Sequence, residues 1–152
     1  MKDFEYLQVV MNVAHLRSNP KYKEAELMRR KLGAHGAATM AKAPQGSEQY
    51  ANIRLLIGTW NRISVFAGEF SAPQKRRFFK CHPVGLTWKV LAPGVEVIRM
   101  NLEKTDNVPE PVTKDYAKDL EALAAEYTKW TKTTDGKEYQ SEARQAVCAD
   151  FG

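Results

Sequence analysis

The chain has 152 residues, which is the length of a single domain. Hydrophobic residues make up 43% and charged residues 27%, as in soluble globular proteins, and two cysteines, nine glycines and seven prolines exclude disulfide-stabilised and collagen-like classes. The net charge of +5 is unevenly distributed: residues 1–90 carry 15 Lys and Arg against 6 Asp and Glu, whereas residues 91–152 carry 8 against 12. The basic part is suited to dock on the acidic part or on an acidic partner, and composition leaves both alternatives open.

No stretch of the sequence predicts a membrane span or an export signal. The longest apolar stretches are interrupted by Arg, Lys or Asn well before the ~20 residues that a transmembrane helix needs. The first five residues, MKDFE, lack the basic and apolar regions of a signal peptide. Cys81 and Cys148 have no metal-ligand spacing and are expected to be reduced thiols. The sequence therefore predicts a soluble, cytoplasmic protein.

Two amphipathic helices are predicted at the start of the chain. The first runs from Phe4 to Leu16 with Asp3 as its N-cap, and the second begins at Pro20 and is stopped by Gly33. Residues 33–46 are small and weakly patterned, so they are expected to form a long loop with at most one helical turn. The residues expected to face the core are Phe4, Leu7, Val10, Met11 and Ala14 in the first helix and Tyr22, Ala25, Leu27, Met28 and Leu32 in the second.

The best-defined helix is predicted from Glu48 to Phe70, with Ser47 as its N-cap. Its apolar arc is broad, so we expect a central helix with neighbours on two sides and with Trp60 buried in the middle. Gly58 costs about 1 kcal/mol in a helix relative to Ala, and close packing of another backbone is one reason for its presence. The arc comprises Tyr50, Ile53, Leu56, Ile57, Trp60, Ile63, Phe66, Ala67 and Phe70.

Three further segments complete the chain. Ser71 opens a short basic helix, QKRRFFKCH, which Pro83 ends. Residues 86–100 fit a β-hairpin, because β-branched residues flank a Pro-Gly turn, but they equally fit two short helices broken at Pro93. A last long helix with a near-heptad seam is predicted from Val112 to Trp130, followed by a polar tail, residues 133–152, that is expected to be frayed or disordered.

Four stretches occur in order within residues 5–130: NPKYKEAELMRRKL, NIRLLIGTWNRISVFAGEF, VGLTWKVLAPGVEVIR and YAKDLEALAAEY. Together they resemble an uncharacterised family of bacterial helical domains, whose Trp…Leu-x-Pro…Arg segment corresponds to Trp88, Leu91, Pro93 and Arg99. Members of that family are frequently tethered by an N-terminal membrane helix, for which this sequence has no counterpart, and the family implies no activity. The resemblance implies an all-α fold and favours helix at residues 86–100. We therefore expect one compact bundle of about five to six helices over residues 1–132, with the hairpin as the alternative.

The candidate partner-binding residues are the cations of two basic helices. In KRRFFK four cations flank two aromatic residues, which is suited to phosphate contacts and base stacking. The same pattern is expected of a short amphipathic helix with Phe78 and Phe79 in the core and solvated cations around them, and charge runs alone favour this alternative. The candidates are Lys75, Arg76, Arg77 and Lys80, together with Arg29, Arg30 and Lys31 in the last turn of the second helix.

No catalytic, cofactor-binding or metal-binding residues are predicted. Cys81 and His82 are adjacent, so on a helix they do not face each other, and a buried cysteine beside a helix-terminal histidine is expected. Arg99 is expected to form a buried ion pair with Glu69 or Asp119. Phosphate-binding loops, HExxH and GxSxG motifs do not occur.

These features favour a non-enzymatic helical protein-interaction module, a bacterial or phage-borne inhibitor or adaptor that occludes or bridges a partner protein. An acidic protein partner is predicted from the charge, and the alternative is a nucleic-acid-binding module that uses the basic N-terminal half. A homodimer through the aromatic helix faces is also compatible with the sequence. Those faces comprise Tyr50, Trp60, Phe66 and Phe70 in one helix and Tyr116, Tyr127 and Trp130 in the other.

Overall fold

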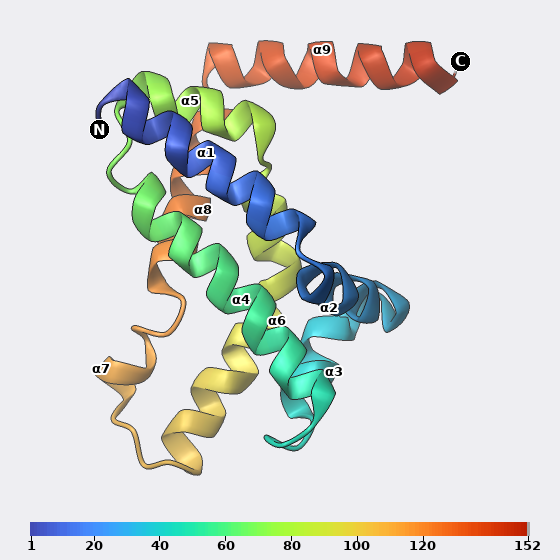
Figure 1. Cartoon of the computed structure of the whole chain (residues 1–152), viewed down its shortest axis with the longest axis vertical. Helices are drawn as coiled ribbons and strands as arrows, with labels where there is room; N and C mark the ends of the chain where they lie inside the picture. The colour runs from blue at the N-terminus through green and yellow to red at the C-terminus, as the bar shows by residue number, and fades with distance from the viewer. Residues whose placement is uncertain (152) are drawn as a thin grey trace.

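The computed structural model describes the backbone of residues 1–151 and the side chains of residues 1–142. Over residues 1–151 the chain forms nine α-helices, one short 3₁₀ helix and no strand (Figure 1). The all-α class is thus confirmed, with more helices than the five to six predicted. The elements are α1 (Asp3–Ser18), α2 (Pro20–Lys31), η1 (Gly33–His35), α3 (Gly36–Lys42), α4 (Glu48–Ala67), α5 (Ala72–Cys81), α6 (Val84–Lys104), α7 (Glu110–Thr113), α8 (Lys118–Thr131) and α9 (Thr134–Phe151).

Helix α4 is central, as its broad apolar arc predicts. Its N-cap is Ser47, whose hydroxyl accepts a hydrogen bond from the Tyr50 backbone N–H. The helix packs against α2, α3 and α8 and also contacts α1 and α6. Trp60, in the middle of α4, is 4% exposed, which confirms its predicted burial. Nothing lies within 4 Å of a Cβ added at Gly58, so the close backbone packing suggested for that glycine does not occur.

Residues 33–46 differ from the predicted long loop, because α3 occupies half of that segment. Helix α3 packs mainly against α6 and also against α4, and Ala37, Met40 and Ala41 are buried between them. A Cβ added at Gly94 of α6 would lie 3.0 Å from the backbone oxygen of Ala37. The small residues that made the segment look like a loop are therefore those that allow two helix backbones to approach closely.

Helix α6 continues through Pro93 for 21 residues, so neither the β-hairpin nor two separate helices form. Leu91, Val95 and Ile98 are buried on one face, at the spacing of successive helical turns. Pro93 lies on the exposed face, as does Lys89, whose carbonyl loses its helical donor. Water can satisfy that carbonyl, and the burial of the opposite face outweighs the local preference for strand.

The predicted last helix is divided into α7 and α8. Ala117, between them, has a left-handed backbone with φ of 61°. The Arg99 guanidinium stabilises this break, because it donates to the Tyr116 carbonyl oxygen at 2.7 Å and pairs with Glu121 at 3.0 Å. Asn61 of α4 accepts from the Leu120 backbone N–H at 3.0 Å and so caps α8 from another helix. Both partners that stabilise the break come from distant parts of the chain.

Helix α9 replaces the frayed tail that the polar composition predicted. Its first turns are tied to the molecule by Tyr139, whose ring lies 5.8 Å from that of Trp130 and whose hydroxyl donates to the Lys80 carbonyl oxygen. A row of aromatic rings continues from Trp130 into α5, with Phe79 at 5.7 Å. In Figure 1, α9 crosses the top of the bundle and extends beyond it.

Most of the apolar stripe predicted for α1 faces solvent, and of its members only Val10 packs partly buried against the core. Tyr6 and Val13 are buried, whereas Phe4, Leu7 and Met11 are 70%, 57% and 72% exposed. The Tyr6 ring packs edge-on against the Phe70 ring at 4.9 Å between centroids, which turns the opposite side of the helix to solvent. In α2, Tyr22 and Ala25 are buried as predicted, but Leu27 and Leu32 are exposed.

Candidate functional site

The two aromatic residues of the basic helix α5 lie in the core. Phe78 is 1% and Phe79 is 4% exposed. Phe78 packs against Phe70 at 5.5 Å between ring centroids, and Phe79 packs against Tyr127 at 5.4 Å. Neither ring is free to stack on a base. The prediction of an amphipathic helix with an apolar inner face is confirmed.

Most cations of α5 are engaged within the chain. Lys75 pairs with Glu126 of α8 at 2.8 Å, and Lys80 pairs with Asp135 of α9 at 3.3 Å. These two pairs join the basic first part of the chain to its acidic second part, which is the intramolecular alternative that composition left open. The lowered pKa of Asp135 has its main cause in the hydrogen bond from the Trp130 indole, with Lys80 contributing further.

Two α5 cations remain. Arg77 pairs with Asp3 of α1 at 3.7 Å, and its guanidinium lies 5.2 Å from the centre of the Tyr6 ring. Arg76 is exposed and forms no ion pair with the side chains of residues 1–142. Within the part of the chain whose side chains are described, Arg76 is thus the one α5 cation without an ion pair, whereas the sequence suggests four.

The cations of α2 have a different setting, because they line a groove. The groove has a volume of about 250 Å³ and lies between α2 and the first half of α6, with the end of α1 at one rim. Three arginines line it, Arg17, Arg29 and Arg30, and none of the α5 cations does. The other lining residues are Tyr22, Glu26, Trp60, Pro83, Leu86, Thr87, Val90 and Leu91.

A single carboxylate orients two of these guanidinium groups. Glu26 accepts from Arg29, and from Arg30 at 3.2 Å. The Arg29 side chain is 13% exposed, whereas that of Arg30 is 71% exposed and can reach a partner. Lys31, the third predicted α2 cation, is exposed and does not line the groove. One negative charge against three positive charges leaves the groove cationic.

The floor and the opposite wall of the groove are of different chemistry. On the floor, the Trp60 indole N–H donates to the Tyr22 hydroxyl at 2.7 Å. Burial raises the pKa of Tyr22, so its hydroxyl is neutral. On the α6 wall, Leu86 is 60% and Val90 is 41% exposed. The groove therefore combines a cationic wall, an apolar wall and a polar floor, a combination that sequence periodicity does not reveal.

Arg17 at the rim is positioned by two aromatic rings. It donates to Nδ1 of His82 at 3.3 Å, and its guanidinium lies 5.8 Å from the centre of the Trp60 ring. Burial lowers the pKa of His82, and the charge of Arg17 lowers it further. His82 ends α5, as predicted, but Cys81 is exposed, contrary to its predicted burial. Cys148 lies outside the residues whose side chains are described.

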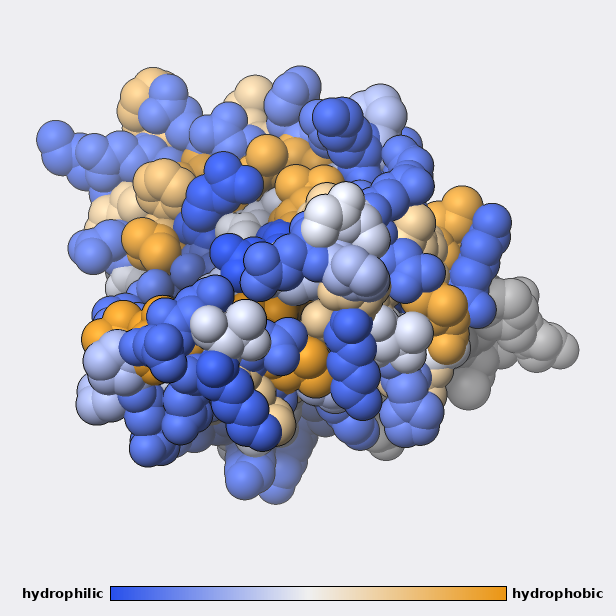
Figure 2. Space-filling model, turned by 90° about the horizontal axis from the view of Figure 1, so that it is seen from below, coloured by the Kyte–Doolittle hydropathy of each residue, from blue (hydrophilic) through white to orange (hydrophobic). Residues whose placement is uncertain are grey.

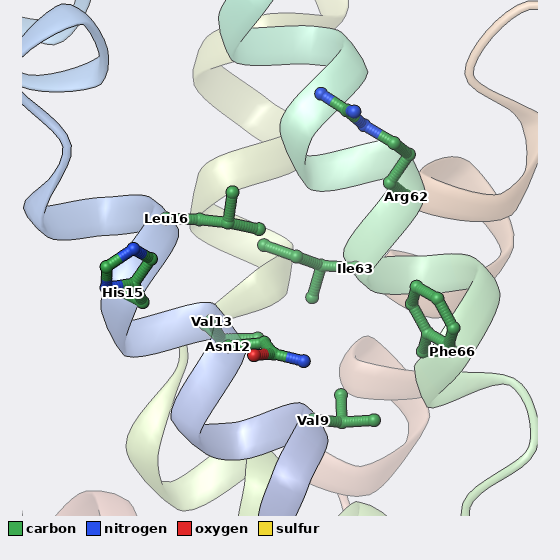
Figure 3. Close-up of a pocket in the computed structure, with 8 residues that line it drawn as sticks. All are labelled: Val9, Asn12, Val13, His15, Leu16, Arg62, Ile63 and Phe66. Atoms are coloured by element: carbon green, nitrogen blue, oxygen red, sulfur yellow. The ribbon is translucent and has the colours of Figure 1, made fainter.

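A second groove separates α1 from α4 and is mostly apolar (Figure 3). Its volume is about 290 Å³. Figure 3 shows Leu16 of α1 and Ile63 of α4 pointing toward one another, with Phe66 at the α4 side. Phe66 is 55% exposed, unlike Trp60 and the other rings predicted to form a dimer surface on this helix.

The remaining features concern the ion pair of Arg99, possible metal ligands and the hydropathy of the helices. Arg99 pairs with Glu121 and not with Glu69 or Asp119, which corrects the predicted ion pair. Among the described side chains, no three His, Cys, Asp or Glu residues are grouped as metal ligands would be. None of the helices within residues 1–151 combines the length and hydropathy needed to cross a bilayer. Seen from below, the molecule is covered mainly by hydrophilic residues, with hydrophobic residues in separate groups (Figure 2).

Comparison of the chain with protein-family models, curated proteins and solved structures finds no match. The resemblance to a bacterial helical family is therefore supported in its fold class alone. Any function has to be argued from the site itself.

Proposed function

We propose that the chain is a non-enzymatic protein-interaction module that binds an acidic segment of a partner protein in the groove between α2 and α6. By filling that groove the partner segment is held on a rigid helical scaffold, which suits an inhibitor or adaptor that occludes or bridges its partner. The proposal rests above all on one observation, the three arginines that line this groove with a single acidic residue, Glu26.

The two walls of the groove define the segment that would fit. Carboxylates of the partner would pair with Arg17 and Arg30, and bidentate contacts favour arginine over lysine in this role. An apolar side chain of the partner would cover Leu86 and Val90, which are otherwise exposed. The proposed ligand is thus a short segment in which acidic and apolar residues alternate or follow one another.

Nucleic-acid binding, the alternative, receives less support. Phe78 and Phe79 would supply base stacking, but both are core residues. Lys75 and Lys80 would supply phosphate contacts, but each is paired with a carboxylate of a C-terminal helix. Phosphate binding by these lysines would have to break both pairs.

The test compares two charge reversals on the same helix. Arg30→Glu changes the groove, and Lys23→Glu makes the same change of charge at an exposed α2 position outside it. The probes are fluorescein-labelled peptides in which Asp and Glu alternate with Leu and Phe, with single- and double-stranded DNA for comparison. We expect Arg30→Glu to weaken peptide binding by about 10-fold or more and Lys23→Glu by no more than about 2-fold.

The salt dependence of binding distinguishes the two functions. Binding to DNA would fall steeply as salt rises, whereas binding that buries Leu86 and Val90 would fall less. Tight binding of DNA by the wild-type chain, or equal losses in the two variants, would show that this groove is not the binding site for an acidic protein segment.

A further inference from the structure

His82 is half-buried where α5 ends, between the end of α1 and the middle of α4. Its Nδ1 lies 3.3 Å from a guanidinium nitrogen of Arg17 in α1. The centre of its ring lies 6.2 Å from that of Trp60 in α4 and 4.7 Å from that of Phe78 in α5. One cation and two aromatic rings therefore pack around a side chain whose own charge changes near neutral pH.

The contact with Arg17 determines where His82 carries its proton. A guanidinium group only donates hydrogen bonds, so Nδ1 of His82 is the acceptor and the imidazole carries its proton on Nε2. A second proton, on Nδ1, would remove this hydrogen bond and place two positive charges next to each other. Burial lowers the pKa of His82, and the charge of Arg17 lowers it further, in agreement with this geometry.

The other groups around His82 bring no negative charge to it. Trp60 of α4 and Phe78 of α5 are neutral, and Cys81, next to His82 in the chain, is exposed. The first turn of α6, residues 84–87, has no titratable side chain. Within residues 1–142, no carboxylate forms an ion pair with His82. A protonated His82 would therefore lack a counter-ion of its own.

Arg17 connects His82 to the groove between α2 and α6. It lines that groove, as does Pro83, the residue that follows His82. Among the described side chains Arg17 has no carboxylate partner either, because Glu26, the acidic residue of the groove, is bound by the other two arginines. The Tyr22 hydroxyl on the floor is neutral. A charge on His82 therefore acts directly on the rim of the groove.

We propose that Arg17 and His82 form a pH-responsive anchor at the rim of the groove, which holds a carboxylate of the acidic partner segment more tightly once His82 is protonated. This inference rests on the proposed function and adds regulation to the same site. Protonated His82 and Arg17 repel each other, and a carboxylate beside them offsets this repulsion. By linkage, the bound segment raises the pKa of His82, and protonation of His82 raises the affinity for the segment by the same factor. The affinity should therefore rise as the pH falls.

The test measures binding of unlabelled peptides, in which Asp and Glu alternate with Leu and Phe, by calorimetry from about pH 8 to about pH 5.5, a range in which the peptide carboxylates stay ionised. For the wild type we expect the affinity to rise by about 5-fold or more over this range. His82→Gln keeps a hydrogen-bond acceptor for Arg17 but does not titrate, so its affinity should change by less than about 2-fold. The matched control is His15→Gln, which removes an exposed histidine of α1 that does not line the groove. This control should keep the pH dependence of the wild type.

A second measurement follows the His82 ring itself by NMR titration, and it tests the anchor even if His82→Gln does not fold. Saturating peptide should raise the pKa of His82, and Arg17→Gln should raise it in the free chain, because a repelling charge is removed. An affinity of the wild type that stays constant or falls as the pH is lowered, a pH dependence that persists in His82→Gln, or a pKa of His82 that is unchanged in Arg17→Gln would overturn the anchor while the proposed function stands. Absence of peptide binding at every pH would overturn both.

Discussion

Two glycines in helix interiors, Gly58 and Gly94, are expected to respond in opposite ways to replacement by Ala, because α3 packs closely on α6 at Gly94 and nothing packs on Gly58. Replacing Gly58 of α4 by Ala adds a methyl group with nothing within 4 Å. The gain in helix propensity should therefore stabilise the protein by about 0.5–1 kcal/mol. Replacing Gly94 of α6 by Ala brings the same gain in propensity, but its methyl group would lie 3.0 Å from the Ala37 oxygen and 3.2 Å from the Ala37 Cβ.

Overpacking of this kind costs about 1–3 kcal/mol, and because the nearest atom belongs to the backbone, it cannot move aside as a side-chain end would. We expect Gly94→Ala to lower the free energy of unfolding by up to about 2 kcal/mol in net terms, after the ~1 kcal/mol gain in propensity. In a domain of this size, each kcal/mol shifts the melting temperature by about 2–4 °C. Thermal unfolding followed by circular dichroism should therefore place Gly58→Ala above the wild type and Gly94→Ala below it. If Gly94→Ala proves as stable as Gly58→Ala, α3 does not lie against α6 as described.

Further predictions concern single contacts. Trp60→Ala should lower the free energy of unfolding by about 3–5 kcal/mol, because it removes a buried ring. Tyr22→Phe should lower it by about 1–3 kcal/mol, because the Trp60 indole N–H loses its acceptor. Urea unfolding measures both variants, and an unchanged midpoint for either would contradict the contact assigned to it. Asn61→Ala should cost about 0.5–2 kcal/mol by uncapping Leu120 at the start of α8, and faster amide exchange in α8 would locate the effect there. Because the pKa of His82 is lowered in the folded state, the unfolded chain binds a proton first as the pH falls through 6.5. The free energy of unfolding should therefore decrease as the pH falls, and His82→Asn should reduce this pH dependence. Parallel profiles of unfolding free energy against pH for the wild type and His82→Asn would refute the prediction.

The sequence predicts the helices of this protein where the local signals agree. Ser47 and Ser71 cap α4 and α5 as expected, and the broad apolar arc of α4 correctly places Trp60 in the core. The seam residues Leu120, Leu123 and Trp130 are buried, but the single helix predicted from Val112 onward is divided. Arg99 and Asn61 stabilise the break, and no residue near Ala117 predicts it. Partners that are distant in sequence decide such points, and periodicity carries no information about them.

The prediction of which side of α1 is buried is wrong for a related reason. Two stripes exist on this helix, and the longer one, with Phe4, Leu7 and Met11, is the natural choice on periodicity alone. The structure buries the side with Tyr6 and Val13, because the Tyr6 ring meets Phe70 at the end of α4. An amphipathic helix with two apolar sides can bury either, and only its neighbours choose between them.

The two basic runs of the chain show that sequence alone also does not distinguish between candidate binding sites. KRRFFK in α5 and RRK at the end of α2 are equally plausible partner-binding sites from sequence. In the structure, Glu126 and Asp135 neutralise Lys75 and Lys80 of α5, and they come from about 50 residues further along the chain. Among the described side chains, the only acid paired with the α2 arginines is Glu26, about one turn away, which orients Arg29 and Arg30 and leaves a surplus of positive charge. A basic run therefore keeps a surplus of positive charge where the fold places no second carboxylate beside it, and among the described side chains the shorter run is the one that meets this condition.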